Sequence, residues 1–544
     1  MSKVQFAPFV IICILLFEIP SSQASVKTTE YIVVEDTIKL ATDVYLPDGQ
    51  GPFPCILGRS PYDKTHFKND AEMFVQKGYA VVCQDTRGKF ASSGVFYAFR
   101  DDRLDGLATI QWIKKQPWHN GKICGWGGSY VGYTQWAVSD ALDVLTPLIT
   151  TANMYDALYP EGIFSLGLAF RWGLVVNSNK IHPIAPEKMK ASYTILPLSV
   201  ADDSTGKSNH FTDDWLSHPY PDAYWGAMNH RAPVSAPVFS AAGWYDIFLM
   251  AQIKDFEMLG TNRHPDSHLV IGPWAHGKPA TKIDFGDQAD LGKHIAPMIH
   301  RFIDKFMQED TIKVIQAPFQ DKPYLLFIMQ RNEWYASDQW PPRKTCFSHY
   351  YMGADEQLTA KLPKQSGRAE WTYDPADPFP SLGGTIIGND VGTAWQNDNL
   401  VRTDQVAFET LVMDSALILL GTIDATLYIS TDAPSTDIVV CLQDVFPDSN
   451  ILNIQEGGTT IYNDAASSQR LQKVDVSVWA TGYQIHAGHK FRVVVTSSWF
   501  PRYNRNLNTG EPIFSAKRMR AAHQCLYFGS EYPSHVTLPI LAID

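Results

Sequence analysis

Ser129 lies in the stretch GWGGSYVGYTQWA (residues 125–137), which also places glycines at positions 125, 127, 128 and 132. A serine hydroxyl is not ionised at neutral pH, so a nucleophilic serine needs a neighbouring base, and that base needs a carboxylate to orient it. Most glycine-rich stretches are loose loops. The other interpretation is a turn so sharp that larger side chains would collide, which is how α/β-hydrolases present a nucleophilic serine.

The segments on either side of Ser129 favour the sharp turn. The run GKICGWGG before it is typical of a strand, and YVGYTQWAVS after it is typical of a helix. A strand, a serine flanked by glycines and then a helix is the arrangement that a nucleophile elbow requires.

Two later residues have the types and positions of the missing partners. In α/β-hydrolases the order along the chain is serine, acid, histidine, each directly after a strand. Asp246 follows the strand-like run VFSAAGWY, and His276 follows LVIGPWA. Either residue alone is more often a cap or a surface group, but the three together favour catalysis. His264 and His268 are rival bases, although both precede the second of these strands instead of following it.

The surrounding pattern predicts an α/β domain that carries these residues. YIVVED and IKLATDVYLP are expected to form a β-hairpin, and FPCILGR and YAVVCQD are apolar runs typical of parallel strands buried on both faces. DAEMFVQKG is expected to be a helix that ends at Gly78. Residues 150–232 predict an aromatic-rich helical insertion. After about Pro323, closely spaced strands such as YLLFIMQ and ATLYISTD predict a β-sandwich.

The net charge argues against a nucleic-acid partner, and the N-terminal segment predicts export. The chain has 544 residues and a net charge of −12, with no basic run, so nucleic acid is not expected as a partner. Lys3, an apolar run over residues 6–17 and the small residues Ser22 and Ala24 predict a signal peptide over residues 1–24. The apolar run is too short to span a bilayer. We therefore expect a soluble, exported protein (periplasmic or secreted), with no membrane span once the signal is removed.

The cysteines do not indicate a disulfide framework or a metal centre. Six remain once Cys13 leaves with the signal, and they are widely spaced: Cys55, Cys83, Cys124, Cys346, Cys441 and Cys525. The first three lie in apolar, strand-like runs, where buried thiols are expected. The histidine pair His264 and His268, in HPDSH, has the spacing of helical metal ligands, but Pro265 disfavours a helix there. No metal site is predicted.

Long stretches of the chain resemble the family that contains cocaine esterase, the glutaryl-cephalosporin acylases, the α-amino acid ester hydrolases and the X-prolyl dipeptidyl peptidases. The stretches that carry the resemblance run from near residue 38 to residue 510: LATDVYLPDGQGPFPCILGRSPYDK, GYAVVCQDTRGKFASSG, IQWIKKQPWHNGKICGWGGSYVG, AAGWYDIF, IGPWAHG and HAGHKFRVVVTSSWFPRYNRNLNTG. The resemblance implies an α/β-hydrolase domain (residues 25–149 and 233–315), a helical cap (150–232) and a C-terminal all-β jelly roll (316–544).

The resemblance also implies roles for individual residues. Ser129 matches the family's nucleophile, Asp246 its acid and His276 its base. Tyr62, in SPYDK, matches the tyrosine whose hydroxyl completes the oxyanion hole together with the backbone N–H of Tyr130. Without the resemblance, Tyr62 would be interpreted as a packed loop residue. The implied reaction is hydrolysis of an ester or amide through an acyl-serine, with no cofactor.

The substrate is less constrained, and we expect a small-molecule acyl ester or amide. The α-amino acid ester hydrolases place acidic residues two and three positions after the catalytic aspartate, whereas this chain has Phe248 and Leu249 there. Apolar groups suit a neutral acyl chain, which Trp172 of the cap would also contact. Glu161 or another cap carboxylate could still serve an α-ammonium group. The alternatives are therefore an X-prolyl dipeptidyl aminopeptidase, an α-amino acid ester hydrolase or an inactive binding protein. The sequence does not determine whether the chain self-associates.

Overall fold

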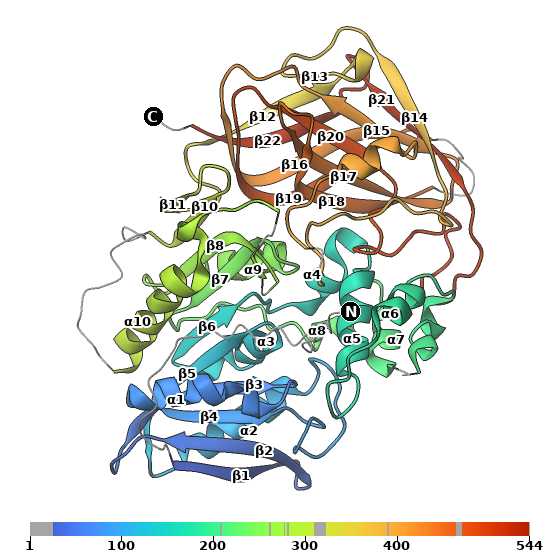
Figure 1. The fold of residues 1–544 in the computed structure, drawn as a ribbon. Helices are drawn as coiled ribbons and strands as arrows, with labels where there is room; N and C mark the ends of the chain where they lie inside the picture. Colours follow the sequence, from blue (N-terminus) through green and yellow to red (C-terminus); the bar gives the residue numbers. More distant parts are fainter. Residues whose placement is uncertain are drawn as a thin grey trace, which may run out of the picture.

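A single large sheet forms the first half of the molecule (Figure 1). The computed structural model describes residues 26–206, 209–260, 263–276, 278–279, 282–308, 322–388, 391–463 and 470–542. The strands of the first sheet follow one another in space as β1 (Val26–Val34), β2 (Ile38–Leu46), β4 (Ala80–Asp85), β3 (Phe53–Ser60), β5 (His119–Gly128), β6 (Val144–Leu148), β7 (Phe239–Tyr245), β8 (His268–Ala275), β10 (Tyr324–Ile328) and β11 (Glu333–Ser337), with β9 (Lys278–Pro279) paired to β8. From β4 to β10 along this path, successive strands pair in parallel. The expected hairpin β1–β2 and the pairs β2–β4 and β10–β11 are antiparallel.

Helices cover both faces of this sheet because its strands are apolar on both sides. They are α1 (Lys68–Gln76), α2 (Asp102–Lys114), α3 (Tyr130–Trp136), α9 (Leu249–Met258) and α10 (Ala296–Met307). Val81 of β4 belongs to the core formed with α1 and α10, whereas its neighbour Val82 belongs to the core that includes α2 and α9. The helix expected to end at Gly78 is α1, and Gly78 has the left-handed φ of 87° that suits a helix end. The α/β class is confirmed.

In the part of the chain that the structure describes, five α-helices lie between β6 and β7 and pack over the carboxyl ends of the parallel strands (Figure 1). They are α4 (Met154–Leu158), α5 (Leu166–Val176), α6 (Pro186–Ser192), α7 (His210–Ser217) and α8 (Ala223–Gly226). Their core is aromatic: Phe170, Phe211 and Trp215 of the cap cluster with Tyr62 and Tyr130 of the first domain. The cap therefore covers the region that carries Ser129.

The C-terminal half is an all-β sandwich, as expected. One sheet contains β12 (Thr345–Met352), β13 (Leu358–Thr359), β14 (Gly367–Tyr373), β16 (Leu417–Thr431), β19 (Gln472–Ile485), β21 (Ala522–Phe528) and β22 (His535–Leu541), and the other contains β15 (Gln405–Glu409), β17 (Ser435–Val445), β18 (Ile451–Tyr462) and β20 (Lys490–Thr496). Leu427 lies in the seven-stranded sheet of the sandwich, and Val440 and Val493 lie in its four-stranded sheet. The three side chains share one buried core. Two antiparallel sheets that share a core in this way form a sandwich.

The large N-terminal sheet, which begins with β1, extends beyond the expected domain boundary at residue 316. The segment YLLFIMQ was expected in the sandwich, but β10 pairs parallel with β8, and β11 pairs with β10. All five residues of β10 are buried. A short, wholly apolar strand suits the interior of either domain, so its pattern cannot tell which sheet it joins.

The cysteines expected to be buried are buried. Cys55, Cys83 and Cys124 lie inside β3, β4 and β5, and the six cysteines of the described residues are all free thiols. Burial raises the pKa of the Cys55 thiol well above its ordinary value. The expected signal peptide, residues 1–24, lies outside the described residues. Within the described ranges, the helices are too short or too polar to cross a membrane.

Candidate active site

Ser129 sits at a strained turn between β5 and α3. Its backbone has φ 55° and ψ −128°, a left-handed conformation that is uncommon for a residue with a side chain. The Ser129 N–H donates to the Leu148 carbonyl at 2.9 Å, which fixes the turn against β6. One turn later, a Cβ atom on Gly132 would lie 2.5 Å from Cγ2 of Thr150. Glycine at 132 thus lets α3 pack directly against the chain that follows β6. The stretch around Ser129 is therefore a well-packed, sharp turn and not a loose loop.

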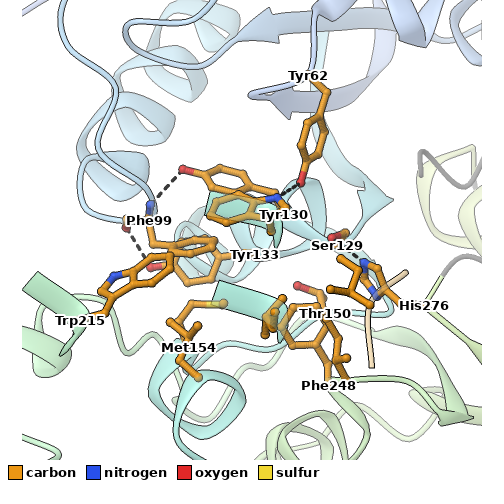
Figure 2. Close-up of a pocket in the computed structure, with 15 residues that line it drawn as sticks. Tyr62, Phe99, Ser129, Tyr130, Tyr133, Thr150, Met154, Trp215, Phe248 and His276 are labelled. Carbon is orange, nitrogen blue, oxygen red and sulfur yellow. Dashed lines mark hydrogen bonds between the residues drawn. The ribbon is translucent and has the colours of Figure 1, made fainter. Parts of the chain in front are cut away.

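The three residues expected to act together do lie together. Ser129 Oγ is 3.0 Å from His276 Nε2, and His276 Nδ1 is 2.9 Å from Asp246 Oδ2 (Figure 2 shows Ser129 and His276). Asp246 is fully buried and His276 is only 5% exposed. The second carboxylate oxygen of Asp246 accepts a hydrogen bond from the Phe248 N–H at 2.8 Å. This is the hydrogen-bond chain by which a serine is activated.

Close packing of β7 against β8 brings Asp246 and His276 within reach of each other. A Cβ atom on Gly243 would lie 2.2 Å from the Trp274 carbonyl oxygen, so glycine there allows the two strands to approach closely just before these residues. The β-sandwich also holds this strand end, because Gln455 Nε2 of β18 donates to the Trp244 carbonyl at 3.0 Å. The C-terminal domain therefore supports the position of Asp246.

The rival histidines lie elsewhere. His268 is the first residue of β8, whereas His276 directly follows the last, so the whole strand separates them. The ring nitrogen Nδ1 of His268 is 3.2 Å from the Lys322 carbonyl, and burial lowers the pKa of His268 to about 4. His264 lies near Asp266, with 3.9 Å between Nδ1 and Oδ2. Neither residue lines the pocket that contains Ser129.

Tyr62 follows β3 and lines the same pocket as Ser129 (Figure 2). Burial raises the pKa of Tyr62 to about 12, and hydrogen bonds with Trp172 and Ser129 oppose that rise. The phenol therefore stays protonated at neutral pH and can donate. Trp172 Nε1 donates to the Tyr62 hydroxyl oxygen at 2.8 Å, so Trp172 and Tyr62, both expected in the site, are in direct contact.

Tyr130 is the first residue of α3, so its N–H belongs to the orphan donors at a helix N-terminus. Its side chain is fixed at the far end: the hydroxyl donates to Asp102 Oδ2 at 2.6 Å and accepts from the Phe99 N–H at 3.0 Å (Figure 2 shows the second bond). Arg59 Nη2 lies 3.6 Å from Asp102 Oδ1. Asp102, Arg59 and Phe99 could not be predicted from the sequence, because nothing in their local pattern indicates a contact with Tyr130.

The pocket beside Ser129 is apolar. Its walls come from the first domain, the cap and the sandwich: Tyr62, Phe99, Tyr130, Tyr133, Thr150, Met154, Leu158, Leu168, Trp172, Trp215, Ile247, Phe248, His276 and Ile387. Among the described residues that line it there is no aspartate, glutamate, lysine or arginine. Phe248 lines the pocket as expected, whereas Leu249 is wholly buried in the core. Glu161 is exposed on the turn Pro160–Gly162 and does not line the pocket.

Two family models and the sequence relatives match most of the chain. Residues 36–278 match the X-Pro dipeptidyl-peptidase (S15 family) model, and residues 305–537 match the model of the X-Pro dipeptidyl-peptidase C-terminal non-catalytic domain. Cocaine esterase from Rhodococcus sp. (strain MB1 Bresler) is 31% identical, with 95% of this chain and 99% of that protein covered. A putative serine esterase of Mycobacterium bovis is 26% identical, over 78% of this chain and 79% of that protein.

Solved structures match in fold over nearly the whole chain. An aminopeptidase from a marine sediment archaeon, Thaumarchaeota archaeon, has a TM-score of 0.83 at 22% identity, covering 97% of this chain and 99% of that one. An α-amino acid ester hydrolase has a TM-score of 0.79 at 23% identity, covering 99% of this chain and all of the other. At these identities the likeness concerns the fold, an α/β-hydrolase-type domain followed by an all-β domain.

Proposed function

The chain belongs to the X-Pro dipeptidyl-peptidase (S15) family of serine hydrolases, together with cocaine esterase, and we propose that it hydrolyses esters of neutral acyl groups with Ser129 as nucleophile. The observation that carries the proposal is the pair of hydrogen bonds from Ser129 to His276 and from His276 to Asp246, at the edge of an apolar pocket. Enzymes of this family act on esters or peptides through an activated serine, and the choice between these substrates depends on the pocket.

The geometry supports the following steps. His276 Nε2 takes the Ser129 proton as Oγ attacks the substrate carbonyl, while Asp246 holds the imidazole tautomer that accepts at Nε2. The alcohol then leaves with that proton, and the acyl group stays on Ser129. Water, activated by His276, releases the acid and restores the serine. Every proton in this sequence moves through Nε2 of one histidine.

Tyr62 and Tyr130 are proposed to stabilise the tetrahedral oxyanion. The Tyr62 hydroxyl is buried and protonated, and the Tyr130 N–H lies at the N-terminus of α3, directly after the nucleophile. Both donors are held in place before substrate arrives. Preorganised donors of this kind each contribute about 3 kcal/mol to transition-state stabilisation.

The pocket supports a neutral acyl group over an α-ammonium group. An ammonium group buried without a negative partner is costly, and the residues described as lining the pocket include no carboxylate. Phe248 and Trp172 offer flat apolar surfaces to an acyl chain or an aromatic ring. Two of the alternatives, an X-prolyl dipeptidyl aminopeptidase and an α-amino acid ester hydrolase, would need a carboxylate to pair with the substrate's ammonium group. The third, an inactive binding protein, would not need a serine hydrogen-bonded to a histidine.

A substrate panel tests this proposal. Purified protein would be assayed with p-nitrophenyl butyrate, phenyl benzoate, the methyl ester of phenylglycine and a Gly-Pro anilide, with Ser129→Ala as the blank. We expect the first two to have the highest kcat/KM. Preference for the Gly-Pro anilide would establish the peptidase alternative, and no turnover of any substrate by soluble, folded protein would favour the binding protein.

Export is part of the proposal as well. The positively charged start, the apolar run over residues 6–17 and the small residues before position 25 support removal of residues 1–24 during secretion. Expression of the full chain in a secreting host, followed by mass spectrometry of the exported and the retained protein, tests it. An exported product that begins at Ser25 is expected, and full-length protein found only in the cytoplasm would contradict it.

A further inference from the structure

The hydrogen bond between Trp172 and Tyr62 has a direction that matters for the reaction. Trp172 lies on α5 of the cap and Tyr62 follows β3, and Nε1 of the first is 2.8 Å from the hydroxyl oxygen of the second. An indole N–H can only donate, so the Tyr62 oxygen must be the acceptor. The single hydroxyl proton of Tyr62 therefore cannot point at Trp172. Tyr62 and Ser129 line the same pocket, so the side of the Tyr62 oxygen that Trp172 does not occupy is available to a substrate held at Ser129.

The indole ring of Trp172 is held by a stack of aromatic rings. It lies 5.3 Å from Phe99 at an interplanar angle of 18°, 5.8 Å from Tyr130 at 22° and 6.3 Å from Trp215 at 15°, measured between ring centroids. Phe99 itself stacks on Tyr130 with 4.7 Å between centroids. With ring neighbours from both the first domain and the cap, the indole cannot turn freely, so the direction of its N–H is fixed.

We propose that Trp172 is a positioning residue for the oxyanion hole: its N–H occupies the acceptor side of Tyr62 and leaves the Tyr62 proton aimed at the reacting carbonyl oxygen. The inference rests on the proposed function, because it assumes that Tyr62 is an oxyanion donor. It adds a role to the contact with substrate expected for Trp172. The donated bond also polarises the phenol, which strengthens its own donation in a dry site.

The test is a double-mutant cycle on kcat. Trp172→Phe removes the N–H donor and keeps an aromatic ring in the stack, although a smaller one. With a short neutral ester as substrate, we expect this change to lower kcat about tenfold, the order expected for one hydrogen bond that strengthens another in the transition state, and to change KM less than about threefold. In a Tyr62→Phe background, the same change is expected to leave kcat unchanged, because the proton it directs is gone.

Trp215→Phe provides the matched control. Trp215 stacks on Trp172 and lines the same pocket, whereas the hydrogen bond to the Tyr62 hydroxyl comes from Trp172. Its substitution is therefore expected to have the same effect on kcat with and without the Tyr62 hydroxyl. Thermal unfolding of each variant, measured in parallel, shows whether a lost rate comes from lost structure.

Two results would overturn the inference, and they are distinguishable. If Trp172→Phe lowers kcat equally in both backgrounds, Trp172 acts through substrate contact or packing, and the proposed function stands. If Tyr62→Phe alone leaves kcat unchanged, Tyr62 is no oxyanion donor, and the inference falls together with that part of the proposed mechanism. Labelling of Ser129 by a fluorophosphonate reports separately on the nucleophile in either case.

Discussion

Ser129 Oγ and His276 Nε2 lie 3.0 Å apart in the folded chain although 147 positions separate the two residues in the sequence. They meet because each follows a strand in the parallel part of one sheet, and parallel strands present their carboxyl ends at the same edge. The cap and the sandwich then close over that edge. The contact thus follows directly from the topology of the sheet.

His276→Ala is expected to lower kcat by about 10⁴-fold or more, because the serine then lacks its base. His268→Ala is the matched control: it removes a buried histidine from the other end of the same strand, far from the pocket. Its kcat per folded molecule should stay within a few-fold of the wild-type value. Steady-state kinetics on a p-nitrophenyl ester measure both. The reverse pattern would move the base to His268.

Tyr62→Phe is expected to lower kcat by about 10²- to 10³-fold with little change in KM, since one oxyanion donor is lost and the ring is kept. The buried, protonated hydroxyl beside Ser129 motivates this expectation. The same steady-state assay measures it. A variant with wild-type turnover would make Tyr62 a packing residue, and the second donor would have to come from another group.

Selectivity for the acyl group provides a further test. The phenylacetyl and phenylglycyl esters of one alcohol differ only in an amino group, which is charged at low enough pH. We expect higher kcat/KM for the phenylacetyl ester, because the described lining of the pocket carries no carboxylate to pair with an ammonium group. Introducing a carboxylate with Phe248→Glu should shift the ratio towards the phenylglycyl ester. A wild-type preference for the phenylglycyl ester would contradict the neutral-acyl proposal.

The environment of Asp70 predicts how the free energy of unfolding depends on pH. It is buried on α1, and its Oδ2 accepts from Trp126 Nε1 at 3.0 Å. Burial raises the pKa of Asp70 to about 6, from 3.8. Between these pH values the folded state keeps a proton that the unfolded state has lost, so the contribution of Asp70 to stability falls as pH rises from about 4 to 6 and is constant above.

Asp70→Asn keeps an acceptor for Trp126 and cannot ionise. Relative to wild type, its free energy of unfolding should improve between pH 4 and pH 7.5, by up to about 3 kcal/mol for a shift of this size. Urea unfolding at both pH values measures the change. The exposed Asp48 offers the control, since Asp48→Asn removes the same charge from the surface. A difference between Asp70→Asn and wild type that does not depend on pH would contradict the prediction.

The residues of the site that directly follow strands could be predicted from the sequence. Ser129, Asp246 and His276 each directly follow an apolar run, and their order along the chain restricts which residues can meet. The hairpin, the helical insertion and the β-sandwich were also visible as local periodicity. These features share one cause: the residues that determine them are neighbours in the sequence.

Contacts between distant segments could not be predicted in this way. Nothing near Trp172 indicates that its N–H meets Tyr62, and nothing near Asp102 indicates that it accepts from Tyr130. Ile387 reaches the pocket from the C-terminal half of the chain, beyond the reach of any local motif. The partner of β10 was missed for the same reason, because a buried strand can pair in either domain.

The most direct measurement is labelling of the purified protein with a fluorophosphonate probe, followed by peptide mass spectrometry. Only a serine activated by a base reacts with such a probe, so the account predicts stoichiometric modification on the peptide that contains Ser129. It also predicts loss of both labelling and ester hydrolysis in Ser129→Ala, with unfolding behaviour like that of wild type. Modification at another serine, or hydrolysis retained by Ser129→Ala, would contradict it.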